Sequence, residues 1–339
     1  MSIPLLLTFQ NHQVVDHTTK SETEFAQPLL QTTMIFIGEI LCILAIQLAS
    51  KTPSLLDPSL LEAIQPQHAY GDHWTVPISP FSCSALWFIF PSACDLISTT
   101  LMNLGLIYST PSVFQMVRSS IVGFSAICSF LFLTRRFLGR EWTAVLTILV
   151  GTGWIVVAAS KEEQNWFGPS LIVLGQLFVA GQFTLEEYLM DRFHVEPVRA
   201  MGIEGLLGTF LLGITLLVSA FVGKDWFDIR AGFEQLLDSD ALWQSALALA
   251  LVVAIFNFFG LAVSTKVGVP GRSAIDTTRT VLVWLLAIHY GWDAFSWLQL
   301  GGFIVLVFGT FAFNGVFASL RAAGRTGWGD HSESAPLLS

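Results

Sequence analysis

The sequence predicts an all-α protein that crosses a membrane several times. Hydrophobic residues make up 53% of its 339 residues, whereas Asp, Glu, Lys and Arg together make up only 12%. That charged share is half the roughly 25% expected of a soluble domain. The apolar residues also fall into runs of about 20, the length that an α-helix needs to cross a hydrocarbon core of about 30 Å. We therefore expect about nine transmembrane helices.

The predicted spans are separated by polar segments, and several begin near a proline. Proline is tolerated in the first turn of a helix because its missing N–H would be unpaired there. The spans cover residues 28–50, 81–108, 111–134, 141–160, 168–190, 198–222, 241–265, 270–290 and 296–318. The boundary prolines are Pro28, Pro80, Pro111, Pro169, Pro197 and Pro270.

Residues 1–27 precede the first span and contain only a short apolar piece, Ile3–Phe9, followed by polar residues. So short a piece cannot cross a bilayer. The segment also lacks the basic stretch and small-residue cleavage site of a signal peptide. We expect residues 1–27 to form an irregular segment on the luminal side.

Basic residues outside the spans predict the orientation of the chain, because short cytosolic loops are enriched in Lys and Arg. If the loop with Arg135, Arg136 and Arg140 is cytosolic, ten of the fourteen basic residues at the ends of the spans or outside them face the cytosol. This orientation places the C-terminal tail, residues 319–339, in the cytosol.

The tail carries a pattern typical of acidic dileucine sorting signals. Its residues are Glu333, Leu337 and Leu338. The pattern predicts binding of cytosolic adaptor proteins and delivery to lysosomal or other endomembranes, although so short a pattern also occurs by chance.

Two arginines lie inside predicted spans, in similar surroundings. Arg118 ends the segment Phe114–Arg118, and Arg279 ends the segment Ile275–Arg279. A guanidinium at the middle of a bilayer costs about 3 to 17 kcal/mol, depending on how the cost is measured. Two such residues in related settings indicate a polar cavity that both of them serve.

Aligning the two arginines brings further segments of the chain into correspondence. Residues 149–152 fall opposite residues 307–310, both with a Gly-Thr pair, and Glu39 falls opposite Glu204. Internal repeats are common in secondary transporters, whose substrate site lies near the midplane between the repeats. Chance similarity between apolar segments is the alternative.

The alignment divides the chain into two repeats of unequal size. The first, residues 28–160, contains four predicted helices, and the second, residues 168–318, contains five. One further helix before Glu39 would make the repeats equal. We expect that helix to be missing.

Seven segments, in order along the chain, carry a resemblance to a known family, and several place polar residues inside spans. They are Phe88–Asp95, Ser112–Arg118, Leu185–Glu187, Pro197–Gly208, Phe256–Gly260, Ile275–Thr280 and Gly291–Phe295. On these segments the chain resembles the EamA-like drug/metabolite transporter superfamily, and within it subfamily F of solute carrier family 35.

The resemblance implies a bundle of two inverted five-helix repeats with both termini cytosolic, in lysosomal or related endomembranes. The chain departs from the family at its start, where a short unrelated segment replaces the first helix. That helix is expected to pack against the central cavity.

Two glutamates are candidates for proton coupling or for binding a cationic solute. Glu39 and Glu204 lie among apolar neighbours, where a carboxyl group can bind a proton in an acidic compartment. The alternative is that each caps or hydrogen-bonds a neighbouring helix.

Asp95 lies near the middle of its span and requires a partner, because an unpaired buried charge is costly. Arg118 on the following span is the candidate, either as a structural partner or as a second solute contact. Gln115 is three residues before Arg118 and shares its helix face. We expect its amide to face the same space.

The second repeat adds Asn257, Asp276 and Arg279 as candidates for solute binding. Asp276 and Arg279 are three residues apart, so an ion pair within the helix is the alternative. Asn257 can instead hydrogen-bond between helices. Glu186 and Glu187 are adjacent and point to different faces, so one is expected to reach solvent while the other is a gate candidate.

No motif in the sequence indicates an enzyme, a metal site or a cofactor. The four cysteines and seven histidines show no metal-ligand spacing, and neither a Gly-x-Ser-x-Gly motif nor a phosphate-binding loop occurs. The net charge of −9 and the lack of a basic run argue against nucleic acid. Expected partners are a small solute, the bilayer, adaptor proteins and a second copy in a homodimer.

These features predict a secondary transporter of a small organic solute that works by alternating access, with protons as candidate coupling ions. One alternative is a nucleotide-sugar exchanger of the Golgi. Another is a membrane scaffold or receptor that transports nothing. An enzyme is not expected.

Overall fold

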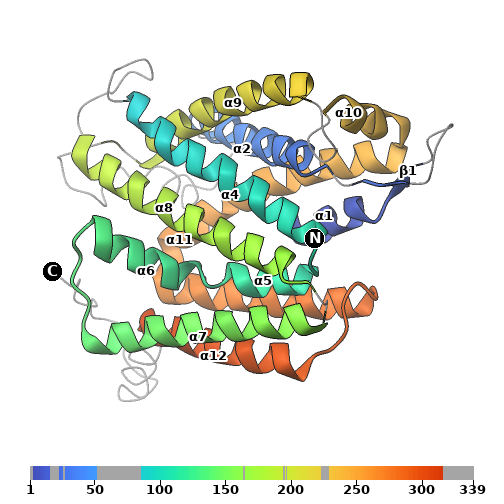
Figure 1. Ribbon diagram of the computed structural model, residues 1–339. Helices are drawn as coiled ribbons and strands as arrows, with labels where there is room; N and C mark the ends of the chain where they lie inside the picture. The colour runs from blue at the N-terminus through green and yellow to red at the C-terminus, as the bar shows by residue number, and fades with distance from the viewer. Residues whose placement is uncertain are drawn as a thin grey trace.

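The computed structural model of the chain is a bundle of α-helices with one small pair of strands (Figure 1). It describes residues 3–15, 23–25, 27–51, 85–162, 165–193, 195, 197–222 and 229–315. The helices are α1 (Ile3–Asn11), α2 (Pro28–Lys51), α4 (Ile89–Ile107), α5 (Pro111–Arg118), α6 (Ile121–Phe132), α7 (Gly139–Glu162), α8 (Phe167–Phe193), α9 (Pro197–Val222), α10 (Ile229–Asp238), α11 (Asp240–His289) and α12 (Trp297–Phe313). The strands β1 (Val14–Val15) and β2 (Thr23–Glu24) pair antiparallel, and a 3₁₀ helix, η2 (Ala85–Phe88), precedes α4. The predicted sorting signal, Glu333, Leu337 and Leu338, lies outside the described residues.

Six helical segments in the described part of the chain are long and apolar enough to cross a membrane. They are Ala85–Ile107, Pro111–Phe132, Gly139–Lys161, Phe167–Phe193, Ala200–Phe221 and Asp240–Asn257. Shorter apolar segments are Pro28–Cys42 and Trp297–Phe313. The prediction of an all-α, multi-pass membrane protein is confirmed.

The predicted span 111–134 is interrupted directly after Arg118. Helix α5 ends at Arg118 and α6 begins at Ile121, so Ser119 and Ser120 lie between them. Ser119 Oγ donates to the carbonyl oxygen of Gln115 at 3.1 Å, and serine pairs are a common cause of kinks. The interruption places Arg118 at a helix end instead of on a continuous helix face.

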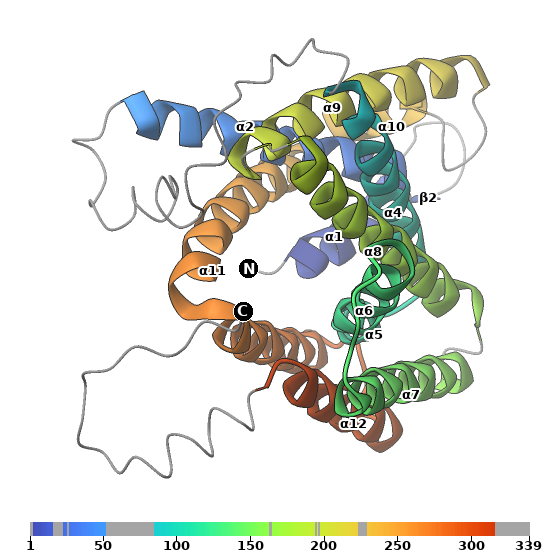
Figure 2. The same cartoon turned by 90° about the vertical axis from the view of Figure 1, so that its left-hand side faces the viewer.

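The two predicted spans 241–265 and 270–290 form a single helix of 50 residues, α11. The interruption expected at Pro270 is absent, because the helix continues through it. A straight helix of this length would extend about 75 Å, far more than a bilayer is thick. Figure 2 shows α11, in orange, curving so that its two ends lie at different places around the bundle.

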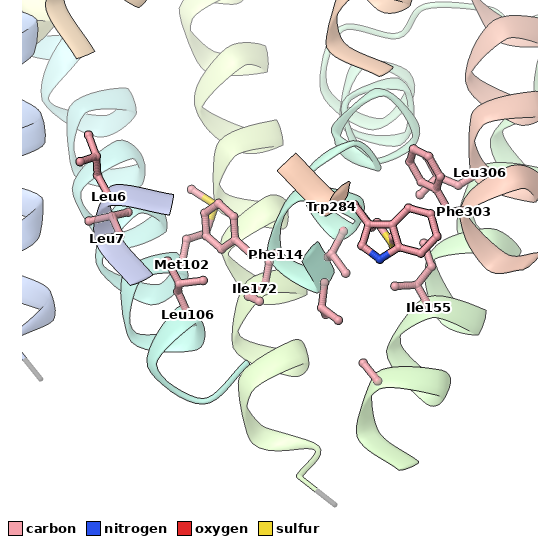
Figure 3. Packing of buried hydrophobic residues seen from close by; sticks show 14 of the residues in the cluster. Leu6, Leu7, Met102, Leu106, Phe114, Ile155, Ile172, Trp284, Phe303 and Leu306 are labelled. Carbon is pink, nitrogen blue, oxygen red and sulfur yellow. The ribbon is translucent and has the colours of Figure 1, made fainter. Parts of the chain in front are cut away.

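The main apolar core connects α1 to α12 across the bundle. Figure 3 shows Leu7 of α1 and Met102 of α4 at one side of this cluster, with Trp284 of α11 and Leu306 of α12 at the other. Phe114 of α5 lies between them and is only 2% exposed. The core therefore anchors the helix that carries Arg118.

Helices α7 and α12 lie side by side at one end of the bundle (Figures 1 and 2), and two glycines allow their close approach. A Cβ on Gly151 would lie 2.9 Å from the Cβ of Leu306, and one on Gly309 would lie 2.9 Å from Cγ1 of Ile148. Each glycine thus contacts the residue three positions before the other glycine. A twofold axis between related helices would produce this reciprocal pattern; the alignment of residues 149–152 with 307–310 itself stays a prediction.

The helices that carry Arg118 and Arg279 meet at the residues that directly follow the two arginines. Ser119 Oγ lies 3.3 Å from Thr280 Oγ1, and Thr280 is 1% exposed. Because the predicted alignment makes these two positions equivalent, their contact also lies where a twofold axis would pass.

Residues 3–11 differ from the expectation of an irregular segment, because they form helix α1 inside the bundle. Leu5 is 2% exposed and packs against Val283 and Ala287 of α11. Gln10 Nε2 donates to Ser245 Oγ of α11 at 3.2 Å. Helix α1 also contacts α4 and α5. Although too short to cross a bilayer, it is held by apolar packing and polar contacts together.

The contacts of α1 in the first half match those of α8 in the second half. Helix α8 packs against α4, α5 and α6, and α1 packs against α11. Under the predicted alignment, α11 is the counterpart of α4, α5 and α6 taken together. If the predicted alignment holds, α1 therefore occupies a position in the first half like that of α8 in the second. The side of the membrane that it faces stays a prediction.

Candidate functional site

A cavity of about 570 Å³ lies inside the bundle, among α1, α2, α4, α5, α8, α9 and α11. Small-molecule sites in proteins commonly enclose about 300 to 1,000 Å³. Helices from both predicted repeats contribute to the lining. The position and size of the cavity are those of a central solute site.

Four carboxylates from four different helices line the cavity. They are Glu39 of α2, Asp95 of α4, Glu186 of α8 and Glu204 of α9. Arg118, at the end of α5, is the basic residue among the described lining residues. With all five side chains ionised, they would carry a net charge of −3. Because uncompensated charge is costly away from water, such a cavity favours bound protons or a cationic ligand.

Gln182 of α8 connects two of these carboxylates. Its Nε2 atom donates to Glu186 Oε1 at 3.0 Å and to Glu204 Oε1 at 3.0 Å. Gln182 and Glu186 are four residues apart and so share one face of α8. Glu204 is only 9% exposed. The amide therefore holds carboxylates of α8 and α9 next to each other at the cavity wall.

Asp95 has a different set of partners. Thr99 Oγ1, one turn further along α4, donates to Asp95 Oδ1 at 3.3 Å. Arg118 lines the same cavity and interacts electrostatically with Asp95. Their expected pairing, whether for structure or for solute binding, stays a prediction.

Helix α9 is held against α4 next to the acidic residues. Ser92 Oγ of α4 donates to the carbonyl oxygen of Glu204 at 3.1 Å and to that of Phe88 at 2.8 Å. Ser92 is fully buried. This interhelical bond positions the backbone from which the Glu204 side chain enters the cavity.

Arg279, the second arginine, contacts an aromatic residue of the cavity wall. Its Cζ atom lies 4.9 Å from the centre of the Phe256 ring, a cation–π geometry. Phe256 itself lines the cavity. Arg118 thus contributes to the wall directly, whereas Arg279 lies behind it.

The remaining predicted site residues are divided between the cavity and its surroundings. Asn257 lines the cavity. Gln115 is not among the lining residues: it is 2% exposed, and its amide donates to Thr280 Oγ1 at 3.4 Å. Gln115 therefore connects α5 to α11. Asp276 lies within α11, but its side chain is outside the described residues.

Comparison with known proteins identifies the family. A human protein named solute carrier family 35 member F6 is 31% identical to this chain over 321 residues, which cover 88% of this chain and 81% of that protein. The chain belongs to solute carrier family 35. The rat protein of the same name is 30% identical, over 91% of this chain and 83% of its own.

Other comparisons add less about this member of solute carrier family 35. An uncharacterised protein of Schizosaccharomyces pombe is 29% identical over 241 residues, 68% of this chain and 74% of its own. No family model matches the chain. A solved crystal structure aligns over 93% of this chain and 95% of its own, with 15% identity and a TM-score of 0.49, too low to support an argument.

Membership of solute carrier family 35 makes the chain a multi-pass membrane protein of a solute transporter family. The cavity brings together the predicted site residues Glu39, Asp95, Arg118, Glu204 and Asn257. Their expected roles in binding and translocation stay predictions.

Two residues of this solute carrier family 35 member belong to the cavity although the sequence did not place them there. Gln182 had no expected role, and of Glu186 and Glu187 one was expected to reach solvent and the other to be a gate candidate. The adjacent Glu187 instead forms an ion pair with Arg135 at the protein surface. The four-residue spacing of Gln182 and Glu186 on an otherwise apolar helix was the available signal.

Proposed function

We propose that this protein is a secondary transporter that moves a small organic solute by alternating access, coupled to protons. The central cavity carries the proposal, because it is large enough for a small solute and contains four carboxylates and a guanidinium from helices of both halves. The proposal assigns binding and release of the solute to this cavity, without chemical conversion.

The contacts between the two halves support alternating access. Such movement requires two bodies that can change their relative orientation around a central site. Under the predicted division of the chain, the contacts between the two include that of Ser119 with Thr280 and the glycine-mediated contact of α7 with α12. The first contact is formed by two small side chains, next to the break between α5 and α6.

The charge of the cavity argues against the nucleotide-sugar alternative. A nucleotide diphosphate carries negative charge, and a site for it requires several basic groups. The described lining contains Arg118 against four carboxylates. The same comparison favours zwitterionic or cationic solutes.

We also propose an acidic endomembrane compartment, such as the lysosome, as the location. Carboxylates away from water can load and release protons across the pH difference of such a membrane. The acidic dileucine pattern at Glu333, Leu337 and Leu338 supports the proposal from the sequence, with adaptor proteins as the expected partners.

A tagged chain should colocalise with lysosomal markers, and the double substitution Leu337→Ala and Leu338→Ala should redirect it to another membrane. Unchanged location of that variant would refute the sorting role.

Transport by purified protein in proteoliposomes tests the function. Labelled amino acids, dipeptides, UDP-glucose or tetraethylammonium are added outside the vesicles, and their uptake is measured without a proton gradient and with a gradient in either direction. We expect gradient-driven uptake of at least one class other than UDP-glucose. The variant Arg118→Leu should lose this uptake, because it removes the basic group of the cavity lining.

Arg135→Leu is the matched control, since Arg135 pairs with Glu187 outside the cavity and the substitution is the same. It should retain the uptake of the unmodified protein. Thermal unfolding establishes that both variants are folded. Undiminished uptake by folded Arg118→Leu, or absence of uptake of every class by the unmodified protein, would overturn the proposed function.

A further inference from the structure

The lining of the cavity has an apolar part and an acidic part, and each restricts the chemical class of ligand that can bind. Four phenylalanines and two methionines contribute to the apolar body. They are Phe36, Phe114, Phe183, Phe256, Met102 and Met201. Aromatic faces attract ammonium groups through cation–π interactions, and methionine adapts to irregular apolar shapes. The volume and the apolar lining therefore indicate an organic ligand. The acidic residues determine which charge on that ligand is favourable.

The acidic wall is concentrated where α8 and α9 meet. Gln182 Nε2 lies 3.0 Å from a carboxylate oxygen of Glu186 and 3.0 Å from one of Glu204. An amide nitrogen carries two hydrogens, so it donates to both groups at once. Among the described residues, neither Glu186 nor Glu204 forms an ion pair. Gln182 therefore brings the two carboxylates together without neutralising them.

Two adjacent carboxylates in a place of low dielectric constant do not both remain ionised without a compensating positive charge. In the absence of a ligand, one proton shared by the pair supplies that charge. A bound ammonium group supplies the same charge. A proton and a cation are thus alternative occupants of this part of the cavity.

The other charged and titratable side chains facing the cavity do not provide the missing charge. Glu39 and Cys42 of α2 and Asp95 of α4 are acids, and Arg118 of α5 interacts with Asp95. On α11, Arg279 stacks on Phe256. The described lining residues of α1 are apolar. Within the described part of the cavity wall, the pair on α8 and α9 is therefore the place where a ligand charge is most stabilising.

We propose that the cavity selects small monovalent organic cations with an apolar or aromatic body, and that Glu186 and Glu204 bind the cationic group in exchange for a proton. In the exchange, the O–H bond of one carboxylic acid breaks and its proton passes to water. The electron pair stays on the carboxylate, which then pairs with the cation. The net charge of the cavity is the same before and after. This inference names the substrate class of the proposed transporter and rests on that function.

Binding to purified protein in detergent tests the inference without requiring transport. The probes are benzyltrimethylammonium and neopentylbenzene, which have the same shape and differ by one positive charge, together with the anion benzenesulfonate. We expect the cation to bind at least about tenfold more tightly than its neutral isostere, because its charge attracts both the carboxylates and the aromatic faces of the cavity. In weakly buffered solution, about one proton should be released per bound cation.

Three single substitutions test whether Glu186 and Glu204 cause the cation binding and the proton release. Glu186→Gln and Glu204→Gln imitate the protonated carboxyl group in size and hydrogen bonding, so the bundle is expected to remain folded. Each should weaken cation binding by about tenfold or more and abolish proton release. Glu187→Gln is the matched control on the next residue of α8, and should bind the cation and release the proton as the unmodified protein does.

The inference is overturned if the cation and its neutral isostere bind equally, if no proton is released, or if Glu187→Gln loses as much binding as Glu186→Gln. Failure here is distinguishable from failure of the transport function. Uptake of an uncharged solute without cation binding would refute the substrate class alone. Proton-releasing cation binding without uptake of any solute would refute transport alone.

Discussion

Alanine at Gly151 should destabilise the protein, whereas alanine at Gly153 on the same helix should not. A Cβ at Gly151 would lie 2.6 Å from the backbone nitrogen of Leu306 and 2.8 Å from its Cα. A Cβ at Gly153 would have no heavy atom within 4 Å. Both glycines lie inside α7, so alanine improves helix propensity equally at the two positions and only the packing differs.

The magnitude follows from these two opposing terms. Replacing glycine by alanine inside a helix gains up to about 1 kcal/mol of helix stability. Overpacking a well-packed contact costs about 1 to 3 kcal/mol. Because the neighbours of Gly151 are backbone atoms that cannot rotate away, we take the upper end of that cost. Gly151→Ala should then lose about 2 kcal/mol and Gly153→Ala should gain up to about 1 kcal/mol.

Equilibrium unfolding in mixed micelles, followed by circular dichroism, measures the difference. Gly309→Ala provides a second test, because a Cβ there would lie 2.9 Å from the backbone nitrogen of Ile148. We expect the unfolding midpoints of Gly151→Ala and Gly309→Ala to fall together, and that of Gly153→Ala to stay or rise. Equal midpoints for Gly151→Ala and Gly153→Ala would refute the close, reciprocal contact of α7 with α12.

Substitutions at three further positions test the packing of α1 and the contact of α5 with α11 by the same unfolding measurement. Leu7→Ala should lose about 2 to 5 kcal/mol, because Leu7 is 1% exposed and belongs to the main core; an unchanged midpoint would mean that α1 does not pack inside the bundle. Ser119→Ala and Thr280→Val, alone and together, should show a coupling energy of about 0.5 kcal/mol or more, because their hydroxyl oxygens lie 3.3 Å apart. Strictly additive effects would exclude that contact.

The positions of the membrane helices were predictable from the sequence, but their internal interruptions were not. An apolar run inside a bilayer has to satisfy its backbone groups, and a helix does so within the run itself. Serine hydroxyls bond carbonyls in straight and in bent helices alike, so Ser119 and Ser120 alone do not reveal the break between α5 and α6. Proline is tolerated inside membrane helices when neighbours compensate. Pro270 therefore did not settle whether α11 ends or continues.

The polar residues of the site were only partly predictable. Glu39, Asp95, Arg118 and Glu204 stand out because ionisable residues inside apolar spans are costly, and the structure places all four at one cavity. The sequence did not reveal that Gln115 turns away toward Thr280, because residues on one helix face still differ in which neighbour they meet.

Gln182 and Glu186 are cavity residues that the sequence did not identify as such. Their four-residue spacing indicates a shared face of α8, but the rotation of that face toward Glu204 depends on how α8 packs against α4 and α9. The sequence also did not reveal which of the two adjacent glutamates faces inward: Glu186 lines the cavity, whereas Glu187 pairs with Arg135 at the surface.

By itself, the sequence determined that this protein is a membrane-embedded bundle of apolar helices and which ionisable residues lie within its spans; the relation between its halves stays a prediction. These properties depend on composition and on local backbone hydrogen bonding. The tertiary structure decided which carboxylates meet, that α1 packs inside the bundle, and that Arg118 faces the cavity directly while Arg279 lies behind Phe256. Those outcomes depend on the rotation and close approach of whole helices, which are set by packing between residues far apart in the chain.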